Sequence, residues 1–511
     1  MVEFNKEKKF YYITTPLYYV NDRPHIGHAY TTIAADVYAR YKRMKGLKVF
    51  FLTGTDEHGQ KVEGAARNAG KSPKEFVDSI ALEFKKLWEL LNIKYDYFIR
   101  TTDPEHEKAV LKFFNKVNDA GDIYLGEYKG YYCVPCETYY TASQLIEADK
   151  CPDCRRPVQL MTEPSYFFKL SKYEKKLLEH IERNKEFIEP EARKNEVINF
   201  IRQGLQDLSI SRTSTKWGVQ LPKDKKHVLY VWFDALLNYI TAPGYGSDSK
   251  KFNSIWPADL HLMGKEIVRF HAVIWPAMLL SAGIELPKRV FGHGWWTVEG
   301  QKMSKSLGNM VDPIEVSRKY SVDAFRYFLL REVPFGSDGD YSEKALVQRI
   351  NSDLADDLGN LLNRTIAMIQ KYFNGEIPEA KKLNEKELQL KEFTLKKARE
   401  ADLFLEKLEF SKSLYCIWEI ISSANSFINE KKPWELAKKT EKEELASVLN
   451  TLAETLRVIS LLLYPYIPET AEKIQLQLGI KSQKFDEAFE WPLIPSKTKT
   501  GRIEILFRKV Q

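Results

Sequence analysis

The hydrophobic pattern near the N-terminus predicts a strand, a helix and a second strand in succession. Residues 10–13 are aromatic and β-branched without polar alternation, which is typical of a parallel strand covered on both faces. A loop containing Pro16 interrupts this strand, and an apolar stripe at helical spacing then runs from near His25 to Tyr41. Residues 49–52 form the next buried strand. Together these elements predict a right-handed βαβ unit.

Similar patterns recur along the chain before it becomes wholly helical. Apolar residues at helical spacing predict helices over residues 73–91 and 105–118. Short apolar runs predict further buried strands over residues 228–233, 260–263 and 290–298. From about residue 342 the helical stripes are separated by short loops, so we expect an antiparallel helical bundle there.

The length and composition of the chain narrow the class of protein. At 511 residues the chain is too long to fold around one ordinary hydrophobic core, so two to four domains are expected. It is 44% hydrophobic and 29% charged, and no apolar run reaches the roughly 18 residues that would span a bilayer. The first ten residues also lack an apolar signal core. We therefore expect a soluble protein without a membrane partner, and the net charge of +7 favours an anionic one.

Four of the five cysteines have the spacing of a metal-binding knuckle. The two pairs are Cys133-x-x-Cys136 and Cys151-x-x-Cys154. Each pair can place two thiolates on one tetrahedral ion, which predicts a Cys₄ zinc ribbon. A redox dithiol would need only one pair, and buried structural cysteines would not pair in this way. Because protein fills all four ligand positions, we expect one structural zinc ion, in a reducing compartment such as the cytoplasm.

Two histidines stand at the predicted start of the first helix. His25 and His28 are three residues apart and therefore lie on the same helix face. A helix N-terminus offers unpaired N–H groups to an anion such as phosphate, and Gly27 would let a flat ring approach the backbone. The alternative is two ordinary surface histidines beside a chance glycine.

A lysine motif in the second half of the chain favours the phosphate interpretation. Lys302-Met-Ser-Lys305 follows a predicted strand, and its two lysines could neutralise a triphosphate on a mobile loop. Lys-x-x-Lys alone is usually a solvated surface. Here both motifs follow predicted parallel strands, where open α/β sheets bind ligands. The sequence contains neither a Walker A loop nor a G-x-G-x-x-G motif, so ATP would have to be held by these two motifs.

The His-Ile-Gly-His and Lys-Met-Ser-Lys-Ser motifs resemble the two signatures of class I aminoacyl-tRNA synthetases, and the resemblance to the methionyl-tRNA synthetase family extends through the whole chain. It implies an α/β fold with a Rossmann-like parallel-sheet catalytic domain and a zinc-knuckle insertion, followed by an all-α helical-bundle anticodon-binding domain. The segments expected are residues 1–118 for the first catalytic half, 119–221 for the insertion, 222–341 for the second half with the lysine loop and connector, and 342–511 for the bundle.

The resemblance also implies roles for single residues. His25 and His28 would bind the phosphates in the transition state, and Lys302 and Lys305 the leaving pyrophosphate. The residues implied for ATP binding are His25, Gly27, His28, His293, Gly294, Lys302 and Lys305. The residues implied for the methionine pocket are Leu17, Tyr19, Asp56, Trp232, Tyr239, Ile267 and His271. The residues implied for anticodon binding are Asn360, Arg364 and Trp434.

Two of these residues are notable without the resemblance. Asp56 follows a predicted strand, where a carboxylate can either meet a ligand ammonium or cap the next helix. In the family, the matching residue binds the amino group of the amino acid. Trp434 adjoins Lys432 at a helix break, where it can either stack on a base or pack the bundle.

The function implied is ATP-dependent attachment of methionine to its tRNA through methionyl-adenylate, with magnesium accompanying ATP. One alternative is another class I synthetase, although leucyl, isoleucyl and valyl enzymes would need a larger editing insertion and a cysteinyl enzyme would use zinc in its active site. Another alternative is a non-catalytic zinc-ribbon tRNA-binding protein. Many family members carry a further C-terminal tRNA-binding domain, which this sequence lacks. We therefore expect a monomer, or a chain that receives such a module from a separate tRNA-binding subunit.

Overall fold

The computed structural model describes residues 8–510, apart from residues 22, 137, 141, 143–144, 148, 299, 303–309 and 440. The chain folds into two compact units. The first comprises Met1–Pro24, Val49–Glu89 and Ile93–His293, and the second comprises His25–Lys48, Leu90–Asn92 and Gly294–Gln511.

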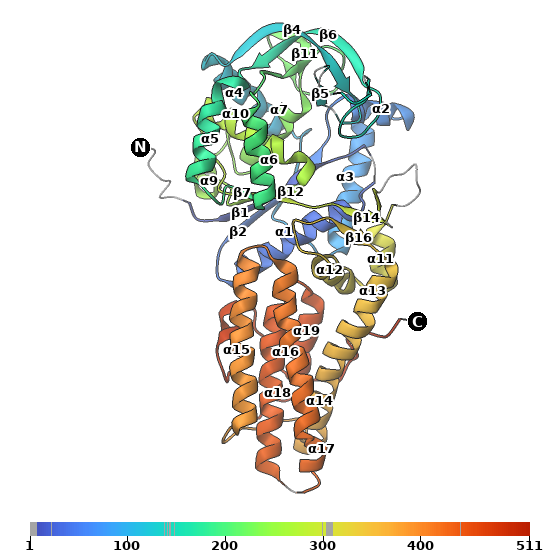
Figure 1. Ribbon diagram of the computed structural model, residues 1–511, viewed down its shortest axis with the longest axis vertical. Coiled ribbons are helices and arrows are strands. Elements are labelled where there is room, and N and C mark those ends of the chain that lie inside the picture. Colours follow the sequence, from blue (N-terminus) through green and yellow to red (C-terminus); the bar gives the residue numbers. More distant parts are fainter. Residues whose placement is uncertain are drawn as a thin grey trace. The chain divides into compact units, whose positions relative to one another are not determined.

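A six-stranded sheet forms the centre of the first unit (Figure 1). In spatial order its strands are β3 (Tyr97–Arg100), β2 (Val49–Asp56), β1 (Tyr11–Tyr19), β12 (Leu260–Gly264), β13 (Val290–His293) and β7 (Ile188–Glu189). All neighbouring strands are parallel. The strand order reverses between β1 and β12, because β1 has its successor β2 on one side and β12 on the other. Open parallel sheets bind ligands outside the carboxyl ends of the strands at such a point.

The helices of the first unit surround this sheet. They are α2 (Gln60–Asn68), α3 (Pro73–Leu90), α4 (Pro104–Asp119), α5 (Glu174–Arg183), α6 (Glu191–Arg202), α7 (Val231–Ala235), α8 (Asn238–Thr241), α9 (Ser249–Ile255) and α10 (Trp275–Ala282). Helices α4 to α10 share the apolar core of the sheet with the strands and loops. β2 is buried along its whole length, as the unbroken apolar run of residues 49–52 predicts for a strand covered on both faces.

Two small antiparallel sheets complete the first unit. One is formed by β5 (Thr138–Tyr140), β4 (Ile123–Cys133), β6 (Gln159–Phe168) and β8 (Leu208–Ser209), and the other by β10 (Gln220–Leu221), β11 (Asp224–Leu229) and β9 (Ser211–Arg212). β4 and β6 pair over almost their full length. Because β4 ends at Cys133, this ladder carries the start of the cysteine-rich segment.

The second unit includes α1 (Ile26–Met44), which is anchored by a buried ion pair. Asp36 accepts a hydrogen bond from Nη2 of Arg326 at 2.7 Å, and both side chains are fully buried. Arg326 lies on α12 (Val322–Arg331) and also donates to the carbonyl oxygens of Tyr466 and Leu91. Both charges are thus paired and hydrogen-bonded, which a buried pair requires.

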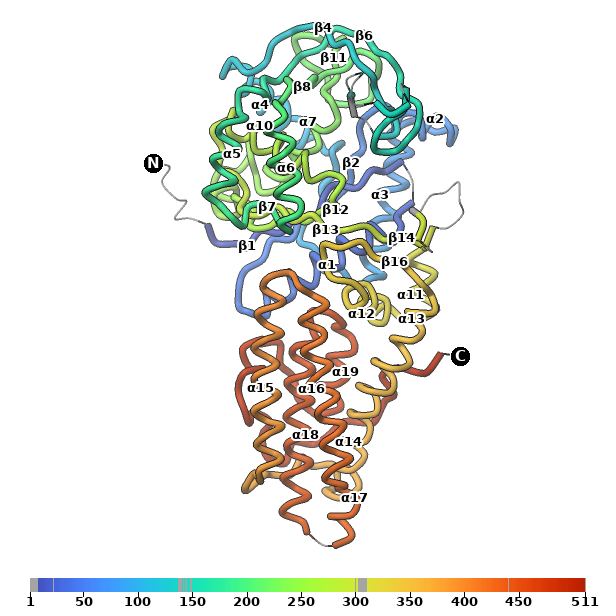
Figure 2. Tube along the Cα trace, in the orientation of Figure 1, coloured from blue at the N-terminus to red at the C-terminus, as the bar shows by residue number. Residues whose placement is uncertain are grey.

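A helical bundle makes up most of the second unit (Figures 1 and 2). The main helices are α14 (Asn360–Phe373), α15 (Glu385–Glu406), α16 (Phe410–Lys431), α18 (Lys442–Leu463) and α19 (Pro468–Leu478), with the short α17 (Pro433–Leu436) between α16 and α18. The remaining elements are β14 (Trp296–Val298), β15 (Gln301–Lys302), β16 (Gly339–Tyr341), α11 (Pro313–Tyr320) and α13 (Glu343–Arg349). The connection from α15 to α16 is short, which makes these neighbours antiparallel as the sequence predicts.

The longest apolar helix of the bundle, α18, is long and apolar enough to cross a membrane by length and composition. Inside the bundle, 94% of its apolar window is buried. Its composition is that of a central core helix, packed against α14, α15 and α16.

The structure corrects three of the predicted elements. The predicted strand 228–233 is wrong at its end, because β11 stops at Leu229 in a small antiparallel sheet and residues 231–235 form helix α7. The predicted strand 290–298 is two strands, β13 and β14, in different sheets. β1 continues through Pro16 to Tyr19 where we expected a loop, and its pairing with β2 shifts by one residue between Thr14 and Leu17. A proline is tolerated at such an irregularity because no ladder hydrogen bond is needed there.

Candidate functional site

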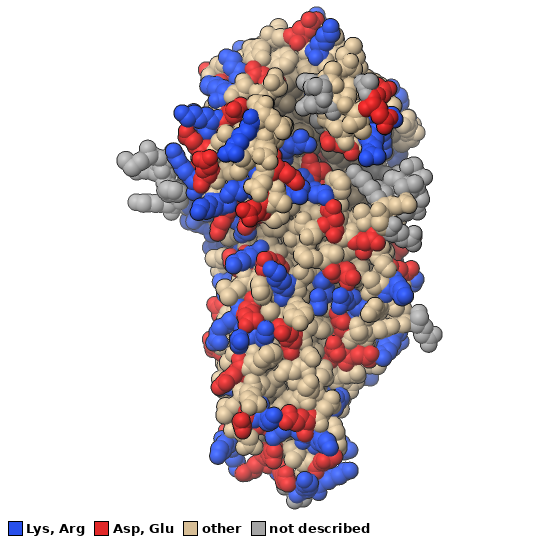
Figure 3. All heavy atoms as spheres, viewed as in Figure 1, with Lys and Arg blue, Asp and Glu red and all other residues tan. Residues whose placement is uncertain are grey.

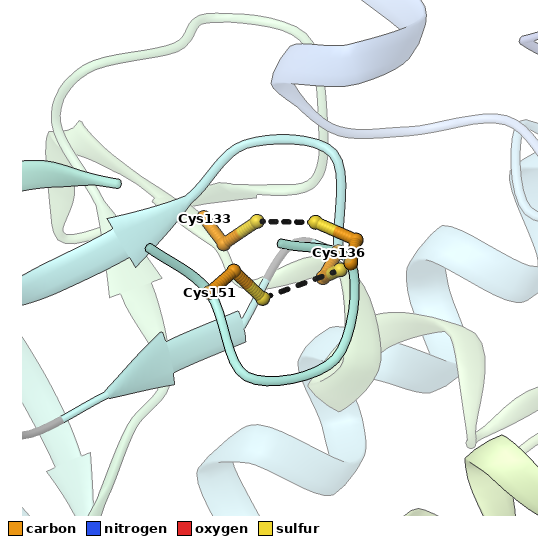
Figure 4. Close-up of side chains that lie close together, drawn as sticks. Cys133, Cys136 and Cys151 are labelled. Carbon is orange, nitrogen blue, oxygen red and sulfur yellow. Dashed lines mark hydrogen bonds between the residues drawn. The ribbon is translucent and has the colours of Figure 1, made fainter. Parts of the chain in front are cut away.

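The four paired cysteines converge on one point. Their sulfur atoms all lie within 4.8 Å of one another, with Cys133 Sγ 3.5 Å from Cys154 Sγ and Cys151 Sγ 3.8 Å from Cys136 Sγ. Figure 4 shows the thiols turned toward each other from the two loops. Burial raises the pKa of Cys133 to about 12, so a cation is needed to hold this thiol as a thiolate. The sequence prediction of a four-cysteine metal site is confirmed in its geometry.

A tyrosine lies within hydrogen-bonding distance of the cysteine cluster. The hydroxyl oxygen of Tyr140 lies 3.3 Å from Cys151 Sγ and donates to the carboxylate of Asp153 at 2.7 Å. Tyr140 is itself buried against the cluster. Hydrogen-bonded groups of this kind fix the orientation of metal ligands.

The residues expected around methionine gather at the carboxyl end of the parallel sheet. Leu17 and Tyr19 close β1, and Asp56 closes β2, where it pairs in register with Tyr19. Ile267 and His271 follow β12. All of these residues therefore flank the point at which the strand order reverses.

Hydrogen bonds link three of the residues in this region. Tyr239 on α8 donates to Nε2 of His271 at 2.7 Å, and Nδ1 of His271 donates to the carbonyl oxygen of Ile267 at 3.0 Å. His271 and Tyr239 are both about 1% exposed. Burial lowers the pKa of His271 to about 4, so the imidazole is neutral at pH 7. His271 lies on a π-helical turn, Phe270–Ile274, of a kind that often occurs at functional sites.

Aromatic rings pack around Trp232 in the same region. The ring of Trp232 stacks on Phe270 with 3.9 Å between centroids, and meets Tyr19 and His271 edge-on at 6.2 Å each. Helical spacing alone predicts only that Phe270 packs in the core, which it does, and does not predict its stacking on Trp232. Helical periodicity contains no signal for this contact, because Trp232 is distant in sequence.

The two histidines of the His-Ile-Gly-His motif accept hydrogen bonds from backbone N–H groups at the start of α1. His25 caps the helix: its Nδ1 accepts from the N–H of Gly27, while Nδ1 of His28 accepts from the N–H of His25, each at 3.1 Å. The two rings are 3.9 Å apart. A Cβ atom at residue 27 would lie 2.9 Å from the His25 ring, so this arrangement requires glycine. Burial and the neighbouring His25 lower the pKa of His28 well below its usual value, which keeps it neutral.

Each histidine therefore carries its ring proton on Nε2, because both Nδ1 atoms accept hydrogen bonds. An Nε2–H group is a donor of the kind that binds a phosphate oxygen. The prediction that His25 and His28 lie side by side at a helix start is thus confirmed, and their contact with phosphate remains a prediction.

The structure describes only some of the other residues expected to bind ATP. His293 is the last residue of β13 and is buried. Gly294 follows it, and a Cβ there would lie 2.1 Å from the carbonyl oxygen of Ser337, so only glycine fits. The backbone of Lys302 pairs with Thr297 in a β-hairpin. Lys305 and the rest of residues 303–309 lie outside the described residues.

Two of the three residues expected at the anticodon meet on the bundle. Arg364 on α14 donates to Oδ1 of Asn429 at 3.0 Å, and its guanidinium carbon lies 5.6 Å from the ring centre of Trp434. Trp434 is partly exposed, so it does more than fill the bundle core. Asn360 is exposed one turn before Arg364 on the same helix.

Comparison with known protein families decides the class of this chain. A family model described as "tRNA synthetases class I (M)" matches residues 11–162 and 156–366, and one described as "Anticodon binding domain of methionyl tRNA ligase" matches residues 377–511. The chain belongs to the methionyl-tRNA synthetase family. The Rossmann-like parallel-sheet fold and the all-α anticodon domain predicted from the sequence are confirmed.

Individual relatives agree with this membership. Methionine--tRNA ligase from Caldanaerobacter subterraneus is 54% identical over 506 residues, which cover 98% of this chain and 79% of the relative. The enzyme of the same name from Thermotoga maritima is 49% identical, covering 98% and 80%. A solved structure of Mycobacterium tuberculosis methionyl-tRNA synthetase in complex with methionyl-adenylate is 44% identical with a TM-score of 0.95, covering 98% of this chain and 99% of that one.

The family membership also bears on partners. Members of the family are aminoacyl-tRNA ligases that use ATP, and the anticodon-domain match extends to residue 511. The expectation of a separate tRNA-binding subunit has no support from these relatives. The alternatives of another class I synthetase or a non-catalytic zinc-ribbon protein are not favoured by any of them.

Proposed function

We propose that this chain joins methionine to its tRNA in two steps. A methionine carboxylate oxygen attacks the α-phosphorus of ATP and displaces pyrophosphate, giving methionyl-adenylate. A terminal ribose hydroxyl of tRNA then attacks the carbonyl carbon and displaces AMP. The observation that carries the proposal is the gathering of Tyr19, Asp56, Trp232, Tyr239 and His271 near the strand-order reversal of a parallel sheet, in a chain that matches the class I synthetase model.

Methionine recognition would use one carboxylate and the side chains around Trp232. Asp56 is buried at the end of β2, where it would pair with the ammonium group of the amino acid. Such a charge-assisted hydrogen bond contributes roughly 1.5–3 kcal/mol. Trp232 offers an aromatic face to the thioether, and sulfur–ring contacts are favourable. Leu17 and Ile267 add apolar surface beside them.

Phosphate binding would use donors rather than a nucleophile. His25 and His28 would donate from Nε2–H to ATP oxygens, and the glycine at residue 27 lets the nucleotide approach the backbone. Lys302 and Lys305 would stabilise the leaving pyrophosphate, with magnesium accompanying ATP. His293 and Gly294 would border the nucleotide after β13. Positioning and charge stabilisation then supply the rate, because no covalent enzyme intermediate is required.

The metal of the cysteine cluster is proposed to be one structural zinc ion. A tetrahedral ion with Zn–S bonds of about 2.3 Å separates its sulfur ligands by about 3.8 Å. The sulfur distances of 3.5 and 3.8 Å fit that geometry. Four thiolates leave no open position, so zinc would stabilise the insertion and take no part in the reaction.

The exposed group on the bundle would read the methionine anticodon. Trp434 would stack on a base, with Arg364 holding its ring and Asn360 offering amide hydrogen bonds from the neighbouring turn. Stacking of this kind is worth roughly 1–3 kcal/mol per base. Positive and negative side chains are interspersed over the face seen in Figure 3.

Two further proposals concern organisation and location. We keep residues 1–118, 119–221, 222–341 and 342–511 as functional segments: two catalytic halves, the insertion and the anticodon-binding bundle. The cytoplasm fits the cysteines, because none of the five is in a disulfide in the described part of the chain and a reducing compartment preserves thiols.

The test of this function is charging of tRNA. Purified chain is incubated with ATP, magnesium, labelled methionine and a methionine tRNA transcript, alongside a transcript with an altered anticodon. We expect labelled aminoacyl ester on the first transcript only. Absence of ester on both transcripts, with adenylate also undetected, would overturn the proposal.

A further inference from the structure

Two histidines and one carboxylate form a buried hydrogen-bonded triad in the first unit. Nδ1 of His58 donates to Oδ2 of Asp234 at 2.6 Å, and Nε2 of His106 donates to Oδ1 at 2.9 Å. The three side chains are at most 3% exposed. They come from three separate places in the first unit: the segment after β2, helix α7 and helix α4.

Two of these three residues are close in sequence to residues expected to contact methionine. His58 is two residues after Asp56, and Asp234 is two residues after Trp232 on the short helix α7. Each end of the His58–Asp234 hydrogen bond therefore fixes a backbone segment that carries a pocket residue. A five-residue helix has little stability of its own, so its orientation depends on contacts of this kind.

The residue between Asp56 and His58 is fixed as well. Glu57 is fully buried and accepts two hydrogen bonds from Arg100 on β3, at 2.6 and 2.8 Å. Trp217 donates from its indole N–H to the carbonyl oxygen of Glu57 at 2.5 Å and packs its ring edge-on against His58. The segment is thus held on both sides, with Glu57 bonded toward β3 and His58 bonded toward α7.

The charges around the triad are consistent with a stable hydrogen-bonded arrangement. Asp234 faces both histidines, and Glu107 lies 4.0 Å from Nε2 of His58. Burial opposes ionisation of Asp234, but the two imidazoles outweigh it and lower the pKa of Asp234 to about 2. The carboxylate is therefore ionised and acts as acceptor for both N–H groups. Nδ1 of His106 has no hydrogen-bond partner among the described residues, which fits the neutral tautomer with its proton on Nε2.

We propose that His58, Asp234 and His106 are positioning residues for the methionine pocket, which hold Asp56 and Trp232 at the separation that methionine needs. None of the three needs to touch the substrate. The inference rests on the proposed function, because it takes Asp56 and Trp232 as the methionine contacts. It predicts that removing the hydrogen bonds among these three side chains weakens methionine binding while ATP binding is retained.

The test compares variants that keep or remove each donor. Asparagine reproduces an Nδ1–H donor and glutamine an Nε2–H donor, so His58→Asn and His106→Gln retain the bonds that His58→Leu and His106→Leu remove. Steady-state ATP–pyrophosphate exchange gives KM for methionine, KM for ATP and kcat for each. Asp122→Asn is the matched control, since Asp122 is a buried carboxylate of the same unit that accepts from Lys172 and Tyr173 outside the pocket.

The expected result is a rise of about tenfold in KM for methionine in both leucine variants, with KM for ATP unchanged and the donor-retaining variants close to the parent protein. Asp122→Asn should lower the melting temperature without this selective change. Equal loss in the leucine and donor-retaining variants, or a parallel rise in both KM values, would overturn the inference. If the parent protein shows no methionine-dependent exchange, the proposed function fails instead. If a leucine variant does not fold, the donor-retaining variants and Asp234→Asn, measured in the same assay, decide the inference.

Discussion

The hydroxyl of Tyr239 and Nε2 of His271 lie 2.7 Å apart, and this contact determines the protonation of the histidine. Nδ1 of His271 is already the donor to Ile267, so Nε2 must accept from Tyr239. A second proton on the ring would remove the acceptor of the Tyr239 hydroxyl and place a positive charge in a buried site. His271 is therefore neutral, and in the proposed methionine pocket it would match an uncharged thioether better than a cation would.

Acid should destabilise the protein through this histidine. The folded-state pKa of His271 is about 4, below the usual 6.5, so the stability due to its neutral form is complete above pH 6.5 and is lost as the pH falls toward 4. This difference between the unfolded-state and folded-state pKa values corresponds to about 3 kcal/mol of the free energy of unfolding. We expect the free energy of unfolding, measured with urea, to fall between pH 6.5 and 4.

The matched variant is His271→Asn, which keeps a donor toward Ile267 but does not titrate. Its unfolding free energy should fall less steeply over the same pH range, because the contribution of His271 is absent while those of other titrating groups, such as His28 and His261, remain. Curves of equal slope for the two proteins would contradict the role given to His271.

Replacing Asp56 by asparagine should weaken methionine binding selectively. The isosteric change removes the negative charge that would pair with the ammonium group, at a cost of roughly 1.5–3 kcal/mol. We expect KM for methionine to rise by roughly one to two orders of magnitude, with KM for ATP nearly unchanged. A large rise in KM for ATP alone would place Asp56 in the nucleotide site instead.

Removal of metal should loosen the insertion without removing the catalytic residues. We expect one zinc ion per chain by elemental analysis, lost on replacement of Cys133 by serine or on treatment with a strong chelator. Loss of zinc should increase hydrogen exchange in β4, β5 and β6, because the insertion has little core apart from the cluster.

Cys416 supplies the control for this experiment. It is a buried cysteine on α16, outside the cluster, and Cys416→Ala should retain the full zinc content. Loss of zinc from Cys416→Ala, or its full retention in Cys133→Ser, would contradict the assignment of the ligands.

The sequence predicts the parallel sheet, the first helix, the cysteine site and the bundle, because each depends on local periodicity or motif spacing. It fails at residues 231–233, where Val-Trp-Phe forms helix α7: a short apolar run has the same pattern in a strand and in a buried helix. Pro16 predicts a break, yet a one-residue shift in strand pairing accommodates it.

Other features of the site have no local pattern in the sequence. The stacking of Trp232 on Phe270 and the hydrogen bonds of Asp234 to His58 and His106 join residues that are far apart along the chain. Only tertiary packing brings these groups together. The requirement for glycine at Gly294 likewise arises from the carbonyl of Ser337, a distant residue.

Trp434→Ala should impair charging of tRNA and leave adenylate formation intact. Loss of one stacked base costs roughly 1–3 kcal/mol, so kcat/KM for tRNA should fall by about 5- to 150-fold. The measurement is aminoacylation with methionine tRNA, beside ATP–pyrophosphate exchange without tRNA. Tyr415→Ala changes another exposed aromatic side chain of the same bundle and should charge normally. Equal effects of the two substitutions would contradict a specific anticodon contact.

The most direct test of the account is ATP–pyrophosphate exchange without tRNA, with methionine, leucine, isoleucine, valine and cysteine each supplied separately. The account predicts rapid exchange with methionine and little with the other four, because the pocket combines a carboxylate, a neutral histidine and an aromatic wall suited to a thioether. Exchange that is absent with methionine, or faster with any of the other four, would contradict it.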